Sequence, residues 1–244
     1  MSDQWATTRF SAFSKLSDAR LAELKDLVGP IRQIGKNEII RHEGERSQVM
    51  YLLCSGWTAS SMAVAGGARQ MIKVHMPGDL LGLPSLALDA AADTLSALTP
   101  VTLLTVEPRA LGRLFATSPH LSALLFLISQ EERVMLMDRL ASLGRTDATA
   151  RLTALVLQLH ARVLRNNPEA GATFQVPLTQ ENLADLTGLT EVHVNRTIKK
   201  LRASKAVRWS RQWITIVDEA ALRQMAGLPE RRLAMDLSWL PLDP

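Results

Sequence analysis

Residues 178–202, LTQENLADLTGLTEVHVNRTIKKLR, predict two short helices joined by a glycine turn. Thr179 can cap the first helix, and Gly188 can end it in the left-handed conformation that glycine tolerates best. Thr190 can cap the second helix at once. That helix has one apolar face, formed by Val194, Ile198 and Leu201. Two helices joined in this way are typical of a helix-turn-helix, whose second helix lies in the major groove of DNA.

The second helix carries polar side chains on the face opposite its apolar residues. A carboxylate there can accept from cytosine N4, an amide can pair with adenine, and a guanidinium can pair with guanine O6 and N7. A valine can touch a thymine methyl, and a histidine can supply a further polar contact. The sequence therefore predicts that this helix reads base edges through Glu191, Val192, His193, Asn195 and Arg196.

A basic run begins on the same helix and continues beyond it. Between Arg196 and Arg211 the chain has seven lysines and arginines and no acidic residue. The segments AVRW and WITIV then flank Ser210–Arg211–Gln212 and predict a β-hairpin. A solvated basic face on an ordinary helical domain would also show such a run, but the capped helices, the glycine turn and the hairpin favour DNA. We expect contacts to phosphates, which position the helix without reading sequence, from Thr179, Thr190, Lys199, Lys200, Arg202, Lys205, Arg208 and Arg211.

The composition bounds the rest of the chain. A length of 244 residues, 47% of them hydrophobic, favours two domains with substantial cores. The single cysteine, Cys54, excludes an intramolecular disulfide and a cysteine-ligated iron–sulfur cluster. The N-terminal residues lack the apolar region of a signal peptide, and the apolar stretch from Leu121 is shorter than the roughly 20 residues of a membrane span. No metal-ligand spacing or catalytic arrangement is evident, so we expect a soluble cytoplasmic protein that is not an enzyme and holds no metal.

Residues 31–106 consist of short β-prone runs separated by glycines. Many short strands with turn signals between them predict an antiparallel barrel or sandwich. A short helix is predicted before this region, after Ser17, and another after it, from Pro108 towards Ser118. A longer helix is predicted from Pro119 roughly to Leu143.

The long helix is apolar on two sides and must therefore be covered on two sides. One cover can be the β domain, and the other can be a second copy of the same helix. A helix buried inside a monomer is the alternative, although Glu131, Glu132 and Arg133 in its middle disfavour it. We therefore predict a homodimer whose interface includes Leu121, Leu124, Leu125, Ile128, Met135 and Ser142.

Together these features resemble the Crp/Fnr family of bacterial transcription regulators. The resemblance rests on YLLCSGW at 51–57, MPGDLLGL at 76–83, DATARL at 147–152 and, most specifically, the helix pair at 178–201. It implies an α+β fold with an N-terminal antiparallel β-roll, jelly-roll-like, that serves as sensor domain. It also implies a long dimerisation helix and a C-terminal winged helix-turn-helix that reads a palindromic operator and contacts RNA polymerase.

The expected divisions of the chain are 1–118, 119–145, 146–227 and a C-terminal extension over 228–244. The first holds the β-roll, the second the dimerisation helix and hinge, and the third the DNA-binding domain. The extension lies beyond the usual end of the family. It can pack as an extra short helix, with Leu233, Leu237, Trp239 and Leu240 as anchors, or simply trail.

The chain departs from the cyclic-nucleotide-binding members of the family in its predicted effector pocket. In those members a Gly-Glu pair, whose Glu binds the ribose, is followed by an Arg-Ser/Thr-Ala segment whose Arg binds the phosphate. Here Leu83 follows Gly82, no arginine lies between Gly82 and Arg109, and Asp93 would repel a phosphate. We expect that cAMP is not bound. An unknown effector, if one exists, would meet Gly82, Leu83, Ser85, Thr94 and Ser96.

Three further alternatives remain open at this point. Haem could be ligated by His75 or Cys54, although both lie in strand-like or apolar surroundings typical of packing. The β domain could have lost sensing altogether. The chain could also be a protein-interaction module with vestigial DNA binding, which a weak dependence of duplex binding on salt would reveal.

Overall fold

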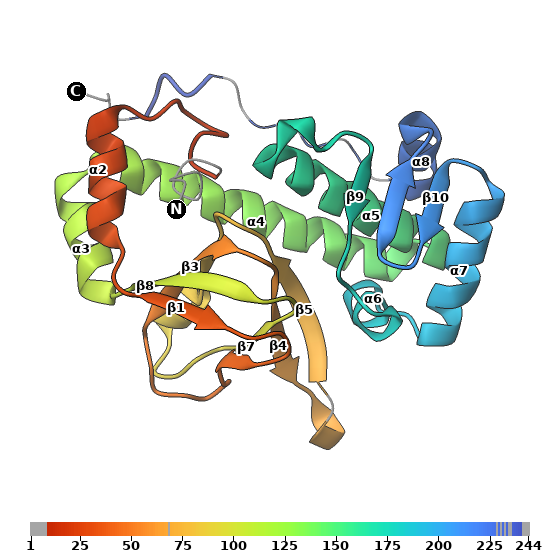
Figure 1. Cartoon of the computed structure of the whole chain (residues 1–244), viewed down its shortest axis with the longest axis horizontal. Helices are drawn as coiled ribbons and strands as arrows, with labels where there is room; N and C mark the ends of the chain where they lie inside the picture. The colour runs from red at the N-terminus through yellow and green to blue at the C-terminus, as the bar shows by residue number, and fades with distance from the viewer. Residues whose placement is uncertain are drawn as a thin grey trace. The chain divides into compact units, whose positions relative to one another are not determined.

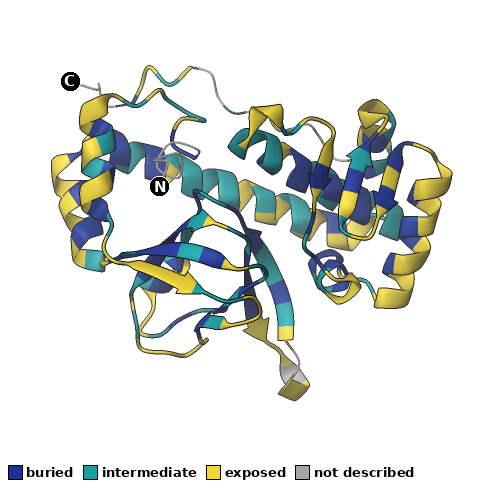
Figure 2. Cartoon of the chain, in the orientation of Figure 1, coloured by how far each residue is buried: buried dark blue, intermediate teal, exposed yellow. Residues whose placement is uncertain are grey.

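The computed structural model describes residues 9–67, 69–227, 229, 231, 233 and 236–240. The chain forms two compact units (Figure 1). Residues 1–131 and 232–244 make up the first unit, and residues 132–231 make up the second. Each unit contains both buried and exposed residues (Figure 2).

The first unit is built on two four-stranded antiparallel sheets, with strand orders β1-β8-β3-β6 and β2-β7-β4-β5. Both sheets contribute to one apolar core, in which Leu53, Leu95 and Leu103 are fully buried. This arrangement confirms the predicted β-roll. The strands are β1 Ile31–Ile34, β2 Ile39–Arg41, β3 Met50–Ser55, β4 Thr58–Ala63, β5 Arg69–His75, β6 Leu80–Leu81, β7 Thr94–Ala97 and β8 Val101–Val106.

Helices pack on β3 and β8 of the first unit and form a second core there. They are α2 Asp18–Leu27, α3 Pro108–Thr117 and the first part of α4 Pro119–Arg145. Leu121, Leu124 and Leu125 of α4 lie in this core with exposed fractions of 0, 0 and 7%. Packing within one chain therefore already covers these three of the residues predicted for the dimer interface.

Helix α4 has 27 residues, about 40 Å at 1.5 Å per residue, which confirms the predicted long helix. The boundary between the two units falls inside this helix, between Glu131 and Glu132. The sequence predicted a hinge near residue 145 instead. Within the described residues, no single helix is both long and apolar enough to cross a membrane. Only α3 and α4 taken together, with a bend of 120° between them, pass that test by length and composition. The exposed large apolar side chains of α4 are Phe126, Val134, Leu136, Met137, Leu140 and Leu143.

The second unit contains the C-terminal part of α4, four further helices and a three-stranded antiparallel sheet of order β10-β11-β9. This is the predicted winged helix-turn-helix, with α6 and α7 as the helix pair. Strand β9 and helix α8 were not predicted. The elements are α5 Ala148–Asn166, β9 Thr173–Gln175, α6 Gln180–Thr187, α7 Glu191–Ala203, β10 Val207–Ser210, β11 Trp213–Ile216 and α8 Glu219–Ala226. The short 3₁₀ helices of the two units are η1 Ala65–Gly67, η2 Leu83–Ala87 and η3 Pro168–Ala170.

The C-terminal extension returns to the first unit. Arg231, the last residue of the second unit, forms an ion pair with Asp138 on α4 at 2.6 Å. Beyond it, Leu240 is buried in the core of the first unit and Leu237 packs against the same core, as predicted for these anchors. Trp239 is 60% exposed, so the prediction that it is an anchor is wrong. Leu233 is half-buried.

Candidate nucleic-acid interface

The helix pair is defined by the hydrogen bonds at its caps. Thr179 Oγ1 accepts from the Asn182 backbone N–H at 3.1 Å, and Asn182 Oδ1 accepts from the Thr179 N–H at 3.0 Å. Gly188 ends α6 with φ 63° and ψ 38°, the left-handed conformation expected for it. Thr190 Oγ1 accepts from the His193 N–H at 3.3 Å and caps α7. These contacts confirm the predicted caps and the glycine turn.

Helices α4 and α5 hold the turn between α6 and α7. Arg139 on α4 donates from Nη2 to the carbonyl oxygen of Asp185 at 3.1 Å. Arg151 on α5 donates from Nη1 to the carbonyl oxygens of Thr187 and Gly188 at 3.2 and 3.3 Å. Burial lowers the pKa of Arg139, and the Asp185 carboxylate opposes that shift. The carbonyl groups at the end of α6, which no helical N–H can satisfy, thus receive charged donors.

Helix α7 buries one face and exposes the other. Val194, Ile198 and Leu201 are buried as predicted, and Thr197 is buried beside them. All five residues predicted to read bases are exposed, and Val192, at 68%, is the most prominent apolar one. With 100° per residue, Val192 and Arg196 lie near the middle of the exposed face, while Glu191 and His193 lie on opposite flanks.

Thr190 fixes the ring of His193. Its Oγ1 lies 2.9 Å from the ring Nδ1 and already accepts the backbone N–H of the same residue. The hydroxyl can therefore donate its own proton to Nδ1, and the neutral ring then carries its proton on Nε2. Because His193 is exposed, this Nε2–H is the donor that it can offer to a base edge.

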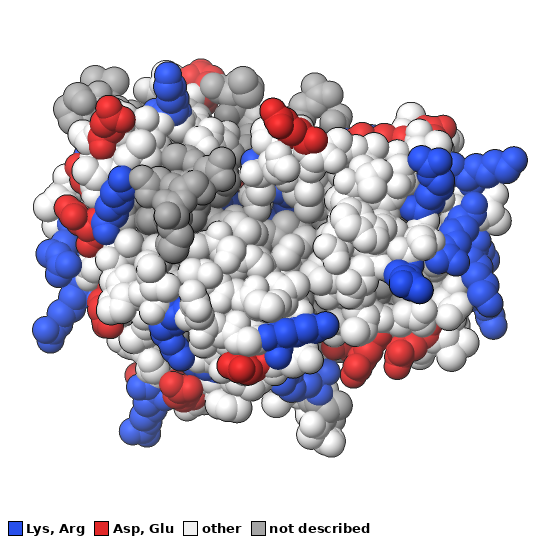
Figure 3. Space-filling model, viewed as in Figure 1, with Lys and Arg blue, Asp and Glu red and all other residues white. Residues whose placement is uncertain are grey.

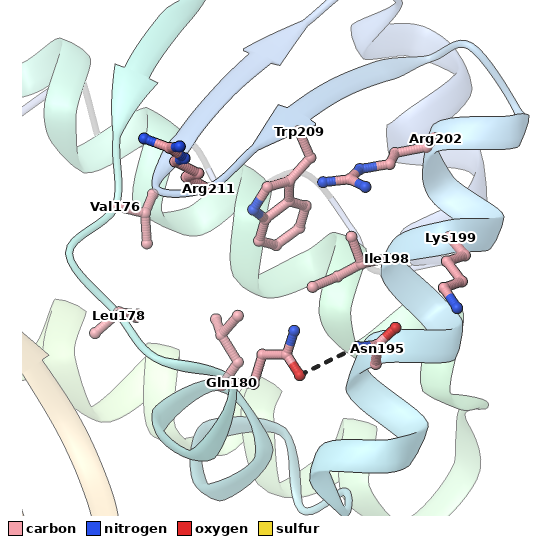
Figure 4. Close-up of a pocket in the computed structure, with 10 residues that line it drawn as sticks. Val176, Leu178, Gln180, Asn195, Ile198, Lys199, Arg202, Trp209 and Arg211 are labelled. Atoms are coloured by element: carbon pink, nitrogen blue, oxygen red, sulfur yellow. Dashed lines mark hydrogen bonds between the residues drawn. The ribbon is translucent and has the colours of Figure 1, made fainter.

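Asn195 is held towards α6 rather than pointing straight out from α7. Its Nδ2 donates to Gln180 Oε1 at 3.4 Å (Figure 4). Gln180 is the first residue of α6 and was not predicted as a site residue. Its position there is a signal that could have suggested it, because side chains at a helix N-terminus lie beside the phosphate-binding N–H groups of that helix. Asn195 and Gln180 together form an amide pair at the edge of the interface.

A hollow of about 170 Å³ lies between the N-terminus of α6, helix α7 and the wing formed by β10 and β11 (Figure 4). Ile198 and Trp209 contribute apolar surface to it. Lys199, Arg202 and Arg211 line the same hollow with three cationic side chains. A hollow with an apolar base and a cationic rim fits a phosphate and its sugar better than it fits an apolar ligand.

The remaining predicted phosphate contacts do not line this hollow, and all of them are exposed. Lys and Arg side chains gather at the edge of the molecule where α7 lies (Figure 3). Strands β10 and β11 pair directly from Ser210 to Trp213, so the turn between them is Arg211–Gln212. Trp213, 52% exposed beside this turn, was not predicted as a site residue. Two of the predicted cations, Lys205 and Arg211, have positive φ angles of 60° and 51°.

The residues predicted for the effector pocket are only partly brought together. Gly82 and Ser85 border a buried arginine, Arg41, that the sequence did not indicate as a site residue. Thr94 is buried close by, and its Oγ1 accepts from the Glu43 N–H at 3.0 Å. Leu83 instead packs against the helical core of the first unit, and Ser96 lies in the β2-β7-β4 pairing.

Neither residue considered for haem has the surroundings of an axial ligand. His75 Nε2 lies 2.7 Å from Ser60 Oγ, and Nδ1 lies 3.7 Å from a carboxylate oxygen of Asp79. Burial raises the pKa of the Cys54 thiol to about 11, which disfavours the thiolate that binds metals. Among the residues that the structure describes, no three His, Cys, Asp or Glu side chains are grouped as metal ligands.

Comparison with known proteins finds a family model that matches each unit. Residues 31–118 match the model of the cyclic nucleotide-binding domain, and residues 150–225 match the Crp-like helix-turn-helix domain. The chain is 27% identical over 215 residues to the nitrogen fixation regulation protein FixK of Bradyrhizobium diazoefficiens. The match covers 88% of this chain and 89% of FixK. It is 23% identical over 218 residues to the fumarate and nitrate reduction regulatory protein of Yersinia pestis. That match covers 89% of this chain and 87% of the Yersinia protein. The solved structure of FixK2 from Bradyrhizobium japonicum matches 84% of this chain and 100% of its own with a TM-score of 0.75 at 21% identity.

The two family models fall on the two units, and the regulators match the chain along most of their length. In the structure these two ranges hold the β-roll and the winged helix-turn-helix, and the long helix α4 lies between them along the chain. The chain belongs to the Crp/Fnr family of transcription regulators.

Proposed function

We propose that this regulator binds a palindromic operator as a homodimer and reads each half-site with α7. The observation that carries the proposal is the exposed face of α7, where side chains able to read bases stand beside a hollow lined by Lys199, Arg202 and Arg211. The side chains read the base edges, and the cations hold the backbone of one strand. Contact with RNA polymerase and action in the cytoplasm, both implied by the family, are part of this proposal.

Arg196 is proposed to contact a guanine. Family members that read a TGA-type half-site place a Glu four residues before the recognition arginine, on the same helix face. Here that position is Val192, and Glu191 comes one residue earlier, about 100° around the helix. The guanine contact is therefore kept, while the cytosine contact of the neighbouring base pair is replaced. Val192 can pack on a thymine methyl, and His193 can donate from Nε2.

The dimer is proposed to form along α4, through a different face from the one predicted. Phe126, Met137 and Leu140 are exposed, and they lie within about 60° of one another around the helix axis. An exposed apolar stripe of this kind favours a second copy of the same helix. In the dimer the two α7 helices must lie about 34 Å apart, one turn of DNA, to enter successive major grooves.

Salt dependence tests whether DNA binding of this kind occurs. Each phosphate that a protein neutralises adds about 0.9 to the slope of log affinity against log salt. For a dimer, Lys200→Ala is expected to reduce that slope by about two. The measurement is fluorescence anisotropy of a labelled duplex at several salt concentrations.

Lys36→Ala is the control, because Lys36 is an exposed lysine of the first unit and its loss changes the net charge equally. We expect the slope of this variant to equal that of the wild type. Duplex binding that hardly varies with salt would contradict the proposal and favour a protein-interaction module. An equal loss of slope in both variants would show that the contact does not involve α7.

A further inference from the structure

The β-roll encloses an arginine. Arg41, the last residue of β2, is 1% exposed, and its side chain is fully covered. Ile40 before it is buried as well, and the register between β2 and β7 shifts between Ile39 and Arg41. Successive side chains of a regular strand point to opposite faces, so it is this bulge that allows Arg41 to turn inward after Ile40.

The guanidinium of Arg41 is only partly satisfied. Its Nη2 donates to Asp93 Oδ1 at 2.7 Å and to Ser85 Oγ at 3.0 Å. Its Nε and Nη1 have no hydrogen-bond partner among the described residues. A guanidinium carries five N–H donors, and a buried charge is stable only when it is paired and hydrogen-bonded. The site therefore keeps donors that a further oxygen acceptor can use.

The pocket residues leave room for this cation and fix the acid beside it. A Cβ on Gly82 would lie 2.7 Å from Arg41 Nη1, so the missing side chain makes space for the guanidinium. Ser85 Oγ also accepts from the Ala92 N–H at 3.1 Å. The residue on the other side of Asp93, Thr94, is tied through its hydroxyl to the backbone of Glu43. Asp93 is thus held from both sides opposite Arg41.

Asp93 lies on the solvent side of the pair. Its side chain is 14% exposed, whereas that of Arg41 is 0% exposed. An anion that enters from solvent meets this carboxylate before it reaches the cation. At short range in a partly buried site, repulsion between two anions is strong enough to prevent both from binding.

We propose that Arg41 is the cation of an anion subsite in the β-roll, and that the chain fills this subsite with its own carboxylate, Asp93. The subsite has the chemistry to take small oxyanions, carboxylates and phosphates alike, but it takes them only when Asp93 is removed. An arginine is thus present beside Gly82, supplied by β2 instead of by the segment after Gly82, and it is already occupied. Arg41 and Asp93 both lie in the first unit, so the proposed anion subsite does not depend on DNA binding.

Asp93→Ala in the full-length protein opens the subsite, and acetate can replace the lost carboxylate. The midpoint of thermal unfolding is measured against sodium acetate and sodium phosphate, with sodium chloride at equal ionic strength as reference. A ligand that binds only the folded state raises stability as its concentration rises. We expect a saturable rise in midpoint for Asp93→Ala in at least one of the two oxyanions, and none for the wild type.

The double variant Arg41→Met/Asp93→Ala is the matched control, because it lacks both the acid and the cation. No rise is expected for it. An equal rise in the wild type or in the double variant would overturn the proposal, as would a folded Asp93→Ala that responds to neither anion. Where Asp93→Ala does not fold in chloride, refolding yield replaces the midpoint. Acetate or phosphate must then restore folding of the single variant and not of the double variant, and the absence of such rescue overturns the proposal as well.

Discussion

At the scale of single residues, two proposed phosphate contacts have a backbone conformation that their side chains disfavour. Lys205 and Arg211 flank β10, and both lie in the left-handed region, with φ angles of 60° and 51°. A non-glycine residue there costs about 1–2 kcal/mol. Both side chains are exposed and line turns, so fold stability alone would favour glycine at both positions. Cations at these positions fit a role in binding an anionic partner rather than in folding.

Arg211→Gly is therefore expected to change stability and binding in opposite directions. The free energy of unfolding of the second unit should rise by about 1 kcal/mol, because glycine relieves the left-handed strain. Affinity for every duplex should fall, because the hollow beside Trp209 loses one of its cations. Denaturant unfolding and anisotropy titrations measure the two effects. Arg211→Lys, which keeps the charge and the strain, should change both quantities less, and undiminished binding by Arg211→Gly would remove it from the interface.

Single residues also mark the limit of what the sequence could show. The exposed face of α7 was predictable, because a period of 3.6 residues separates it from three apolar positions. The role of Arg41 was not, since it depends on a bulge and on Asp93, which lies 52 residues away along the chain. The contact of Asn195 with Gln180 likewise joins two helices, and local spacing carries no information about it.

At the scale of elements, the turn between α6 and α7 is packed against α4. A Cβ on Gly188 would lie 2.6 Å from Leu143 Cδ2, closer than real Cβ atoms approach a neighbour. Arg139 and Leu143 both come from the C-terminal part of α4. Arg139 donates to the Asp185 carbonyl oxygen in the last turn of α6, and Leu143 lies against Gly188. These contacts give a physical reason why residues 132–145 belong to the DNA-binding unit. A movement of this part of α4 would move the helix pair with it.

Gly188→Ala tests this packing, and Gly227→Ala is its matched control. Both glycines end a helix with φ 63°, but among the described residues no atom of a non-neighbouring residue lies within 4 Å of a Cβ built on Gly227. The control should lose about 1–2 kcal/mol of unfolding free energy from the left-handed conformation alone. Gly188→Ala should lose more, because Leu143 must also move. Equal losses in denaturant unfolding would show that Leu143 does not support the turn.

The exposed stripe of α4 gives a second expectation at this scale. Phe126→Glu combined with Leu140→Glu should convert the dimer to monomers, because the charges would be buried between two copies. Operator affinity should fall on the order of 100-fold, since linking two half-site contacts commonly gains that much. Analytical ultracentrifugation and anisotropy measure the two changes. Phe115→Glu on α3 is the control, with an exposed fraction of 52% against 57% for Phe126. A double variant that stays dimeric would exclude this stripe as the interface.

The elements predicted from the sequence were those with strong periodic or capping signals. The β-prone runs that form β1, β3, β4, β5 and β8, the long helix and the helix pair were found where expected. The strands that were missed, β2, β6, β7 and β9, have only two to four residues each, too few for an alternating pattern to show. Helix α8, capped by Asp218, carries the same kind of signal as α6 and could have been predicted. Part of the predicted dimer face of α4 is already buried within one chain, because apolar spacing cannot tell which face the same chain covers.

At the scale of the whole molecule, the chain connects its two units twice. Helix α4 is the first connection, and the C-terminal extension, which returns to the first unit after Arg231, is the second. Leu240 anchors the extension in the same core as Leu121 and Leu124. The residues proposed to contact DNA lie in the second unit, while the Arg41–Asp93 pair and the proposed anion subsite lie in the first. Proposed DNA reading and the proposed Arg41 subsite are therefore assigned to different units.

The measurement that tests the central claim most directly is in vitro selection from a random duplex pool. Wild type, Arg196→Ala and Lys200→Ala are compared. The wild type should select a palindrome whose half-site centres lie about 10 base pairs apart. Arg196→Ala should lose preference at one symmetric base position, since a bidentate arginine–guanine pair contributes about 1–3 kcal/mol of discrimination. Lys200→Ala should select the wild-type site with weaker affinity throughout. If Arg196→Ala selects the same half-site with undiminished preference at every position, α7 does not read the operator as proposed.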